Sequence, residues 1–234
     1  MPPPDPVLAI VIPVYNEEKH IMALLQDWLP VFRDTGKTYR VILIDDGSKD
    51  NSLQLLRTLQ AGNLSIDVHT QANAGHGPAI LKGYKLALGA EWVFQLDSDH
   101  QLETAAFAEL WAKREQFDLL VAQRIERNAS SSRQYISWLA RFLVRLLAGA
   151  GIEDVNSPYR LIRAKCLQKA LEKIPVNSFA PNVMISSWFI RKKNRIFTTT
   201  VQQRKEDLRP SRMNAYFLRG VLRSTLQTIL FRIK

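Results

Sequence analysis

The feature that most constrains the fold of this chain is a set of short, almost unbroken apolar runs separated by segments with helical spacing. The runs occupy residues 7–13, 41–44, 66–69, 92–96 and 117–122. Between the first two, apolar side chains recur at the spacing of one helical face, at Ile21, Leu24, Leu25, Trp28 and Leu29. Apolar strands joined by helices are typical of a mostly parallel sheet covered on both faces. The sequence therefore predicts an α/β fold, with helices over residues 17–32 and 78–90.

Polar clusters follow the first four of these predicted strands. They occupy residues 13–17, 45–48, 73–77 and 97–101. Ligands of open parallel sheets bind beyond the carboxyl ends of the strands. We therefore expect the four clusters, which are far apart in the sequence, to converge along one edge of the sheet and to form a site there.

The last cluster contains two carboxylates one residue apart, Asp97 and Asp99, directly after an apolar strand. Magnesium and manganese prefer oxygen ligands and keep coordination positions open for substrate phosphates. An isolated Asp-x-Asp is more often a solvated turn, because so short a motif also arises by chance. The prediction of a Mg²⁺ or Mn²⁺ site therefore depends on the neighbouring clusters.

Four stretches of the chain resemble a known family when they are taken together. They read Ile-Val-Ile-Pro-Val-Tyr-Asn-Glu-Glu at 10–18, Ile-Asp-Asp-Gly-Ser-Lys-Asp at 44–50, Asn-Ala-Gly-His-Gly at 73–77 and Gln-Leu-Asp-Ser-Asp-His-Gln at 95–101. In this order they resemble the inverting nucleotide-sugar glycosyltransferases of glycosyltransferase family 2. The most similar branch is that of dolichol-phosphate mannosyltransferase, which glycosylates polyprenyl phosphates. The resemblance implies a GT-A fold, a Rossmann-like, mostly parallel sheet flanked by helices, and the second half of the chain matches more loosely.

The resemblance assigns the first three clusters to a nucleotide-diphosphate sugar. The implied donor-nucleotide residues are Pro13, Tyr15, Glu17, Asp45, Asp46, Asn73 and Gly77, together with Asp97. Ordinary turn chemistry is the alternative, because Asp-Gly-Ser closes many strand-to-helix connections and caps the following helix. Residues 73–77 would similarly form a plain loop before a helix that Pro78 opens.

The fourth cluster inherits the family's metal and diphosphate role. The implied ligands of Mg²⁺ or Mn²⁺ are Asp97, Asp99 and Gln101, and Asp99 is one of two expected catalytic residues. A bound metal offsets the charge that develops on the departing nucleoside diphosphate.

The chemical class of the acceptor is predicted from the absence of a candidate general base. A hydroxyl acceptor needs a general base, normally a carboxylate, but residues 173–205 contain no Asp or Glu. A phosphate acceptor is already anionic and instead needs cations. The resemblance implies four residues that bind the acceptor phosphate, Arg124, Arg133, Ser137 and Arg204. Arg124 is also the second expected catalytic residue. Arginine suits phosphate because it donates bidentate hydrogen bonds, whereas solvated surface is the alternative for each arginine.

Two segments depart from the branch. Ser-Pro-Tyr-Arg at 157–160 stands where the branch usually reads Ser-Gly-Phe-Arg, and Arg-Pro-Ser-Arg at 209–212 stands where it reads Gly-x-Ser-Lys. Proline restricts the backbone and removes an N–H donor. We therefore expect the geometry on the acceptor side to differ from that of the branch.

Composition and charge indicate how the chain is organised and what it meets. With 234 residues, 46% of them hydrophobic, the chain can bury one sizeable core. We expect a GT-A domain over residues 7–205, followed at 206–234 by a loop and an amphipathic helix. The net charge of +10 favours a polyanionic partner. Amphipathic, arginine-bearing segments at 136–150 and 215–233 would either lie in a bilayer interface or pack on the sheet.

We expect no membrane span, because no stretch reaches about 18 consecutive apolar residues, and the start of the chain lacks a signal-peptide pattern. These observations predict a cytoplasmic protein that is peripherally associated with the cytoplasmic face of a membrane. Its expected partners are the nucleotide sugar, a lipid phosphate and the membrane surface.

Rival functions explain less of the sequence. A non-catalytic nucleic-acid or polyanion binder would account for the charge, but acidic strand ends would repel phosphate, so we expect no nucleic acid. A nucleotidyltransferase would need an early glycine-rich, basic loop for triphosphate, which the chain lacks. Transfer to a saccharide hydroxyl stays open as the alternative within the glycosyltransferases.

Overall fold

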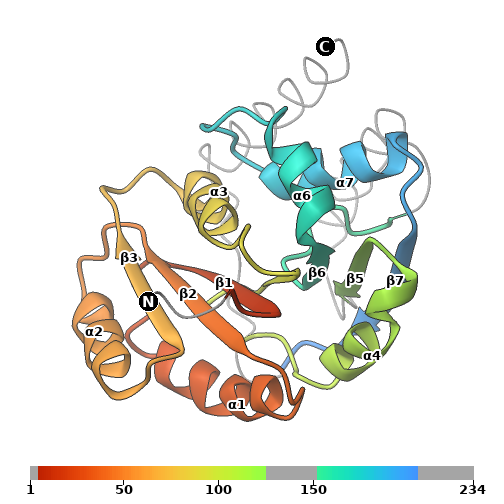
Figure 1. Ribbon diagram of the computed structural model, residues 1–234. Helices are drawn as coiled ribbons and strands as arrows, with labels where there is room; N and C mark the ends of the chain where they lie inside the picture. The colour runs from red at the N-terminus through yellow and green to blue at the C-terminus, as the bar shows by residue number, and fades with distance from the viewer. Residues whose placement is uncertain (1–4, 125–151, 205–234) are drawn as a thin grey trace, which may run out of the picture.

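The computed structural model of the protein describes residues 5–124 and 152–204. Within them, seven strands form one sheet in the order β3-β2-β1-β4-β6-β5-β7 (Figure 1). The strands are β1 (Leu8–Val14), β2 (Tyr39–Asp45), β3 (Ile66–Thr70), β4 (Trp92–Gln95), β5 (Leu119–Arg124), β6 (Arg160–Arg163) and β7 (Ile196–Val201). Among these strands only β6 runs antiparallel to its neighbours. The predicted α/β fold with a mostly parallel sheet is confirmed.

Helices cover both faces of the sheet (Figure 1). One face carries α1 (Ile21–Arg33), α2 (Ser52–Gly62) and α4 (Ala106–Lys113), which the short helix η1 (Arg114–Gln116) follows. The other face carries α3 (His76–Leu86), α6 (Ala164–Leu171) and α7 (Pro181–Arg191). The core accordingly forms two clusters of buried side chains, one between each helical layer and the sheet.

Aromatic packing fixes the first helical layer against the sheet. Trp28 of α1 is fully buried, and its ring centroid lies 5.4 Å from that of Phe94 on β4. Phe94 in turn lies 4.9 Å from Phe107 of α4. Each such ring, removed from water, contributes roughly 1.5–3 kcal/mol. This aromatic cluster fixes the position of β4 relative to α1 and α4. The loop that follows β4 is thereby held in place.

Element boundaries differ from the predicted ones for local reasons. The helix predicted over residues 17–32 begins at Ile21, because residues 16–18 instead bond the neighbouring loop, as described below. The helix expected to open at Pro78 begins at His76. Gly75 precedes it with a φ of 96°, a conformation that glycine adopts at little cost. Pro78 is then the third helical residue, where a missing N–H is not needed.

Several predicted segments fall outside the described residues. They include the amphipathic segments at 136–150 and 215–233 and the proposed C-terminal part at 206–234. Among the helices at 5–124 and 152–204, none is long and apolar enough to cross a membrane.

Candidate active site at the carboxyl edge of the sheet

The polar clusters converge as the strand order requires. Val14 pairs with Asp45 across β1 and β2, and Asp45 pairs with Thr70 of β3, so these three parallel strands end side by side. On the other side of β1, Gln95 ends β4 opposite Val11. Beyond these ends, the four loops that carry the predicted donor and metal residues contact one another at a single edge of the sheet.

The loops after β1 and β2 are joined by reciprocal hydrogen bonds. The Asn16 N–H donates to Ser48 Oγ at 3.0 Å, and the Lys49 N–H donates to Asn16 Oδ1 at 2.7 Å. The Glu17 N–H donates to Ser52 Oγ at 2.8 Å. Asn16 reaches its partners from a left-handed conformation with a φ of 55°, which asparagine tolerates better than most residues. The two loops therefore form one rigid wall of the site.

Predicted donor residues differ in how this wall presents them. Tyr15 is 43% exposed at the rim, with its ring available to a ligand, whereas Pro13 is buried within β1. Asp45 is 2% exposed and closes its own turn, because its Oδ1 accepts the Ser48 N–H at 3.3 Å. Ordinary turn chemistry therefore accounts for the position of Asp45, and its contact with a nucleotide stays a prediction.

Asp46 holds the loop that leads into α3. Its carboxylate is 3% exposed and accepts from Gln71 Nε2 at 2.7 Å and from the N–H groups of Ala74 and Gly75 at 2.9 and 2.8 Å. Asn73 donates its side-chain amide to the Asp46 carbonyl at 3.0 Å. Asp46 and Asn73, both predicted donor residues, thus meet in the structure and order the loop. Their contact with base or ribose stays a prediction.

Two glycines permit close packing around this loop. Gly47 has a φ of 71°, and a Cβ there would lie 2.9 Å from the Asn73 backbone nitrogen. A Cβ on Gly77 would overlap the carbonyl oxygens of Ser178 and Phe179. The space that glycine leaves at position 77 is filled by this backbone, which gives the residue a packing role independent of any nucleotide.

The predicted metal residues lie on the loop after β4. Asp97 Oδ1 accepts from Gln95 Nε2 at 3.2 Å and lies 3.5 Å from His76 Nε2. Asp99 Oδ1 accepts the Gln101 N–H at 3.2 Å. The left-handed His100, with a φ of 57°, turns the chain between Asp99 and Gln101.

This donor set fits a magnesium or manganese ion that is completed by a substrate. Within the described ranges, no three His, Cys, Asp or Glu side chains are grouped to hold a metal on their own. Magnesium sites of phosphate-transferring proteins commonly use only one or two carboxylates, and substrate phosphates and water supply the rest. The Asp97 and Asp99 carboxylates are half-buried at the site edge and match that pattern.

Comparison with known proteins identifies the family. A family model described as "Glycosyl transferase family 2" matches residues 9–191. The chain belongs to glycosyl transferase family 2. The resemblance seen in the sequence is thereby confirmed.

A curated relative in this family is named undecaprenyl-phosphate 4-deoxy-4-formamido-L-arabinose transferase, from Shewanella sediminis (strain HAW-EB3). It is 33% identical over 177 residues, which cover 74% of this chain and 53% of the relative. The Pseudomonas aeruginosa relatives of the same name are likewise covered to 54%, so the chain spans about half their length.

Solved structures show the same fold. The S. aureus TarS 1–349 structure in complex with UDP-GlcNAc superposes with a TM-score of 0.63 at 19% identity and covers 95% of this chain and 66% of that one. Glucosyl-3-phosphoglycerate synthase from Mycobacterium tuberculosis, in complex with Mn²⁺, UDP and glucosyl-3-phosphoglycerate, gives 0.65 at 19% identity and covers 97% and 80%. At this level of identity the similarity concerns the fold, and the predicted GT-A fold is confirmed.

In this glycosyl transferase family 2 domain, the predicted acceptor residue Arg124 ends β5 at the same sheet edge. Its guanidinium forms a bidentate pair with Asp154, with Nε to Oδ2 at 2.8 Å and Nη2 to Oδ1 at 3.2 Å. Asp154 precedes the segment 157–160, which the sequence marked as a departure from the branch. That segment is anchored to β5, because Ser157 Oγ donates to the Ala122 carbonyl at 2.6 Å.

Arg204, the other described acceptor candidate, lies beside the metal loop. Its backbone N–H donates to the Gln101 carbonyl at 2.9 Å, and its guanidinium contacts Asp27 Oδ2 of α1 at 2.5 Å. His100 Nε2 lies 3.0 Å from the same oxygen. Burial raises the pKa of Asp27, but the hydrogen bonds from His100 and Arg204 outweigh it and hold the pKa below its ordinary value. The remaining acceptor candidates, Arg133 and Ser137, lie outside the described residues.

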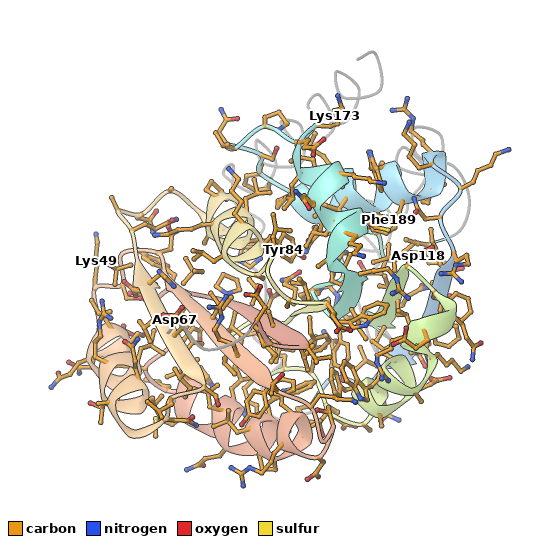
Figure 2. All side chains as sticks on the ribbon, viewed as in Figure 1. Lys49, Asp67, Tyr84, Asp118, Lys173 and Phe189 are labelled. Carbon is orange, nitrogen blue, oxygen red and sulfur yellow. The ribbon has the colours of Figure 1, made fainter. Side chains whose placement is uncertain are left out.

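Sequence reasoning missed a buried polar chain behind the metal loop. It consists of Gln95, Tyr84, Asn182 and Arg160, and Figure 2 labels Tyr84 on α3, on the same side of the sheet as Phe189 of α7. Arg160 is fully buried, and burial lowers the pKa of its guanidinium, while Tyr84, Asp154 and Asp97 act against that shift. The only signal in the sequence was the presence of polar residues at positions that should be apolar.

Proposed function

We propose that this chain is a metal-dependent, inverting glycosyltransferase domain that moves a sugar from a nucleoside-diphosphate sugar to a polyprenyl phosphate. The name of the Shewanella relative, an undecaprenyl-phosphate sugar transferase, supports the acceptor class. The complexes of the two structural neighbours with UDP-GlcNAc and with Mn²⁺ and UDP support the donor class and the metal.

One observation carries the proposal: an acidic half-site and a cationic half-site share the same edge of the sheet. Asp97 and Asp99 follow β4, and Arg124 ends β5, which lies two strands away with β6 between them. A diphosphate bound through a metal on the first side and a phosphate held by an arginine on the second would flank a sugar between them.

Each side of the site has a defined task in the reaction. Asp97 and Asp99, with Gln101, would hold the metal, which supplies charge compensation for the departing diphosphate. Tyr15 at the rim and Asp46 in the wall would contact the nucleotide. Arg124 would bind the acceptor phosphate by charge-assisted hydrogen bonds. One phosphate oxygen forms the new bond to the anomeric carbon, the bond from that carbon to the diphosphate breaks, and its electron pair leaves with the nucleoside diphosphate.

No protein base is needed in this reaction, because the phosphate oxygen that attacks carries no proton to remove. Asp154 is the carboxylate found beside Arg124, upstream of the acid-free stretch 173–205. Both of its oxygens accept from Arg124. This arrangement commits Asp154 to orienting the guanidinium and does not present it to an acceptor hydroxyl.

We further propose that residues 7–205 form the GT-A domain and that residues 206–234 form a loop and an amphipathic helix at a membrane surface. The net charge of +10 supports contact with anionic lipid. Activity on a lipid phosphate would place the protein at the cytoplasmic face, peripherally bound.

The test is a transfer assay on the purified chain. Nucleotide sugars are offered one at a time with a short-chain polyprenyl phosphate and Mn²⁺ or Mg²⁺, and the lipid-linked product is identified by mass spectrometry. We expect one donor to yield a glycosyl phosphate of inverted anomeric configuration. Efficient transfer to a free sugar alcohol, with polyprenyl phosphate ignored, would overturn the acceptor assignment.

A further inference from the structure

We infer that Gln95, held in place by Asn182, is a positioning residue that fixes the Asp97 carboxylate for use with a divalent metal. The inference rests on the proposed function and concerns residues outside the predicted site. Gln95 is the last residue of β4, and its side chain is fully buried. Its Nε2 donates to Asp97 Oδ1 at 3.2 Å.

The orientation of the Gln95 amide follows from its other partners. Its Oε1 accepts from Asn182 Nδ2 at 2.7 Å and from the Tyr84 hydroxyl at 3.2 Å. An ionised Asp97 carboxylate only accepts and Asn182 Nδ2 only donates, so a flipped Gln95 amide would set oxygen against oxygen on one side and N–H against N–H on the other. The amide nitrogen is therefore directed toward Asp97.

Asn182 is fixed just as firmly. It is 2% exposed, and its Oδ1, at 3.0 Å, shares the single proton of the Tyr84 hydroxyl with Gln95 Oε1. Its backbone carbonyl accepts from Arg160 Nη1 at 3.1 Å. As the second residue of α7, Asn182 also shares the rigidity of that helix.

Arg160 closes the chain of contacts from the sheet side. It lies directly opposite Gln95 in the antiparallel pair of β4 and β6, so the two side chains share a face of the sheet. Its guanidinium donates to the Ser157 carbonyl at 2.7 Å and to the Val155 carbonyl at 2.9 Å. A continuous set of buried hydrogen bonds thus runs from Arg160 through Asn182 and Gln95 to Asp97.

A purely structural role explains this arrangement poorly. Packing at position 95 could be achieved by an apolar side chain, whereas a buried amide loses its hydration and must recover every hydrogen bond internally. The set reaches the solvent-accessible site only at Asp97. Partners of metal ligands that fix ligand orientation typically change metal affinity by about 10–100-fold when they are replaced.

The experiment measures Mn²⁺ binding directly, apart from turnover. Mn²⁺ is titrated into the purified chain in the presence of one nucleoside diphosphate, and free Mn²⁺ is followed by electron paramagnetic resonance. The nucleotide is whichever of UDP, GDP, CDP or dTDP stabilises the wild type against heat. Gln95→Met keeps the size of the side chain and removes the donor. We expect it to raise the Mn²⁺ concentration for half-saturation by on the order of tenfold.

Ser178→Ala is the matched control. It removes a buried hydroxyl that donates to the Pro175 carbonyl at 2.7 Å in the loop before α7, outside the set that leads to Asp97. We expect Ser178→Ala to lose about as much thermal stability as Gln95→Met and to keep the Mn²⁺ affinity of the wild type. Asn182→Ala, which leaves Gln95 in place but removes its closest donor, should weaken Mn²⁺ binding by a smaller factor and serves if Gln95→Met does not fold.

The possible failures are distinguishable. Wild-type Mn²⁺ affinity in folded Gln95→Met, or in Asn182→Ala where the first variant does not fold, would overturn the positioning role and leave the proposed function standing. Absence of any Mn²⁺-dependent nucleoside-diphosphate binding by the wild type would overturn both.

Discussion

Arg124 and Asp154 form a two-point ion pair at the carboxyl end of β5, with N–O distances of 2.8 and 3.2 Å. The carboxylate meets the arginine through two oxygens, as a phosphate would. The pair is a partly exposed one, so its value lies in orientation more than in stability. An acceptor phosphate would therefore find a guanidinium whose plane is already set.

Replacement of this arginine should affect the acceptor side alone. Arg124→Ala should raise the KM for polyprenyl phosphate by about tenfold or more, because charge-assisted bonds are lost there, and should leave the donor KM nearly unchanged. Steady-state kinetics with each substrate varied in turn would show the difference. Arg33→Ala, at the exposed end of α1, should change neither constant. Equal losses on both sides would contradict the assignment.

The metal motif predicts a sharper loss. Asp99→Asn should abolish turnover while the melting temperature stays near that of the wild type, because the half-buried side chain contributes little to the core. Excess chelator should likewise abolish turnover by the wild type, and added Mn²⁺ should restore it. Asp34→Asn, the remote C-cap change on α1, should be silent. Full transfer in chelator would exclude a metal role.

Asp46 should show two effects at once. Asp46→Ala removes an acceptor of three hydrogen bonds from the loop at 71–75, so the melting temperature should fall. Donor affinity should weaken by about 1.5–3 kcal/mol if a bond from nucleotide to carboxylate is lost as well. Calorimetric titration with the nucleotide sugar separates the two. A lower melting temperature with an unchanged dissociation constant would leave Asp46 as a loop anchor only.

Acid should destabilise the protein partly through Asp118, which lies beside β5 and β7 (Figure 2). Hydrogen bonds from the Arg195 side chain hold its pKa below the ordinary 3.8, although burial opposes them. Because the folded pKa is the lower one, the stabilisation is complete above the unfolded pKa and is lost as pH falls through the folded one. Melting curves at decreasing pH should therefore show a shallower decline below about pH 4 for Asp118→Asn than for the wild type. Parallel declines would refute this contribution.

The sequence predicted those parts of the fold that depend on local patterns. The runs at 7–13, 41–44 and 92–96 are buried strands because they lie between two helical layers, which leaves no face for polar residues. The shared edge of the polar clusters then follows from parallel strand direction. β6 and β7 were not predicted, because β6 has only four residues with arginine at both ends and β7 carries three consecutive threonines, so neither shows the apolar run of the other five strands.

The candidate site was less accessible to sequence reasoning where residues act through distant partners. Asp27 on α1 has no motif around it, and its relation to Arg204 arises only when the segment after β7 pairs with the metal loop. Asp154 lies upstream of the acid-free stretch 173–205, and no motif in the sequence marks it as the partner of Arg124. Gln95 is adjacent to the metal motif, but its orienting partner Asn182 is 87 residues away.

The reversed direction of β6 divides the sheet into two parts that can change independently in evolution. Because β6 runs opposite to the other strands of the described sheet, its first residue, Arg160, and the segment before it lie at the edge where those strands end. The predicted donor and metal residues come from one continuous stretch, residues 8–101, whereas Arg124 and Asp154 come from β5 and the segment that enters β6. If the two parts bind donor and acceptor as proposed, substitutions in the segment that enters β6 would change acceptor preference over evolution and leave the nucleotide-sugar part unchanged.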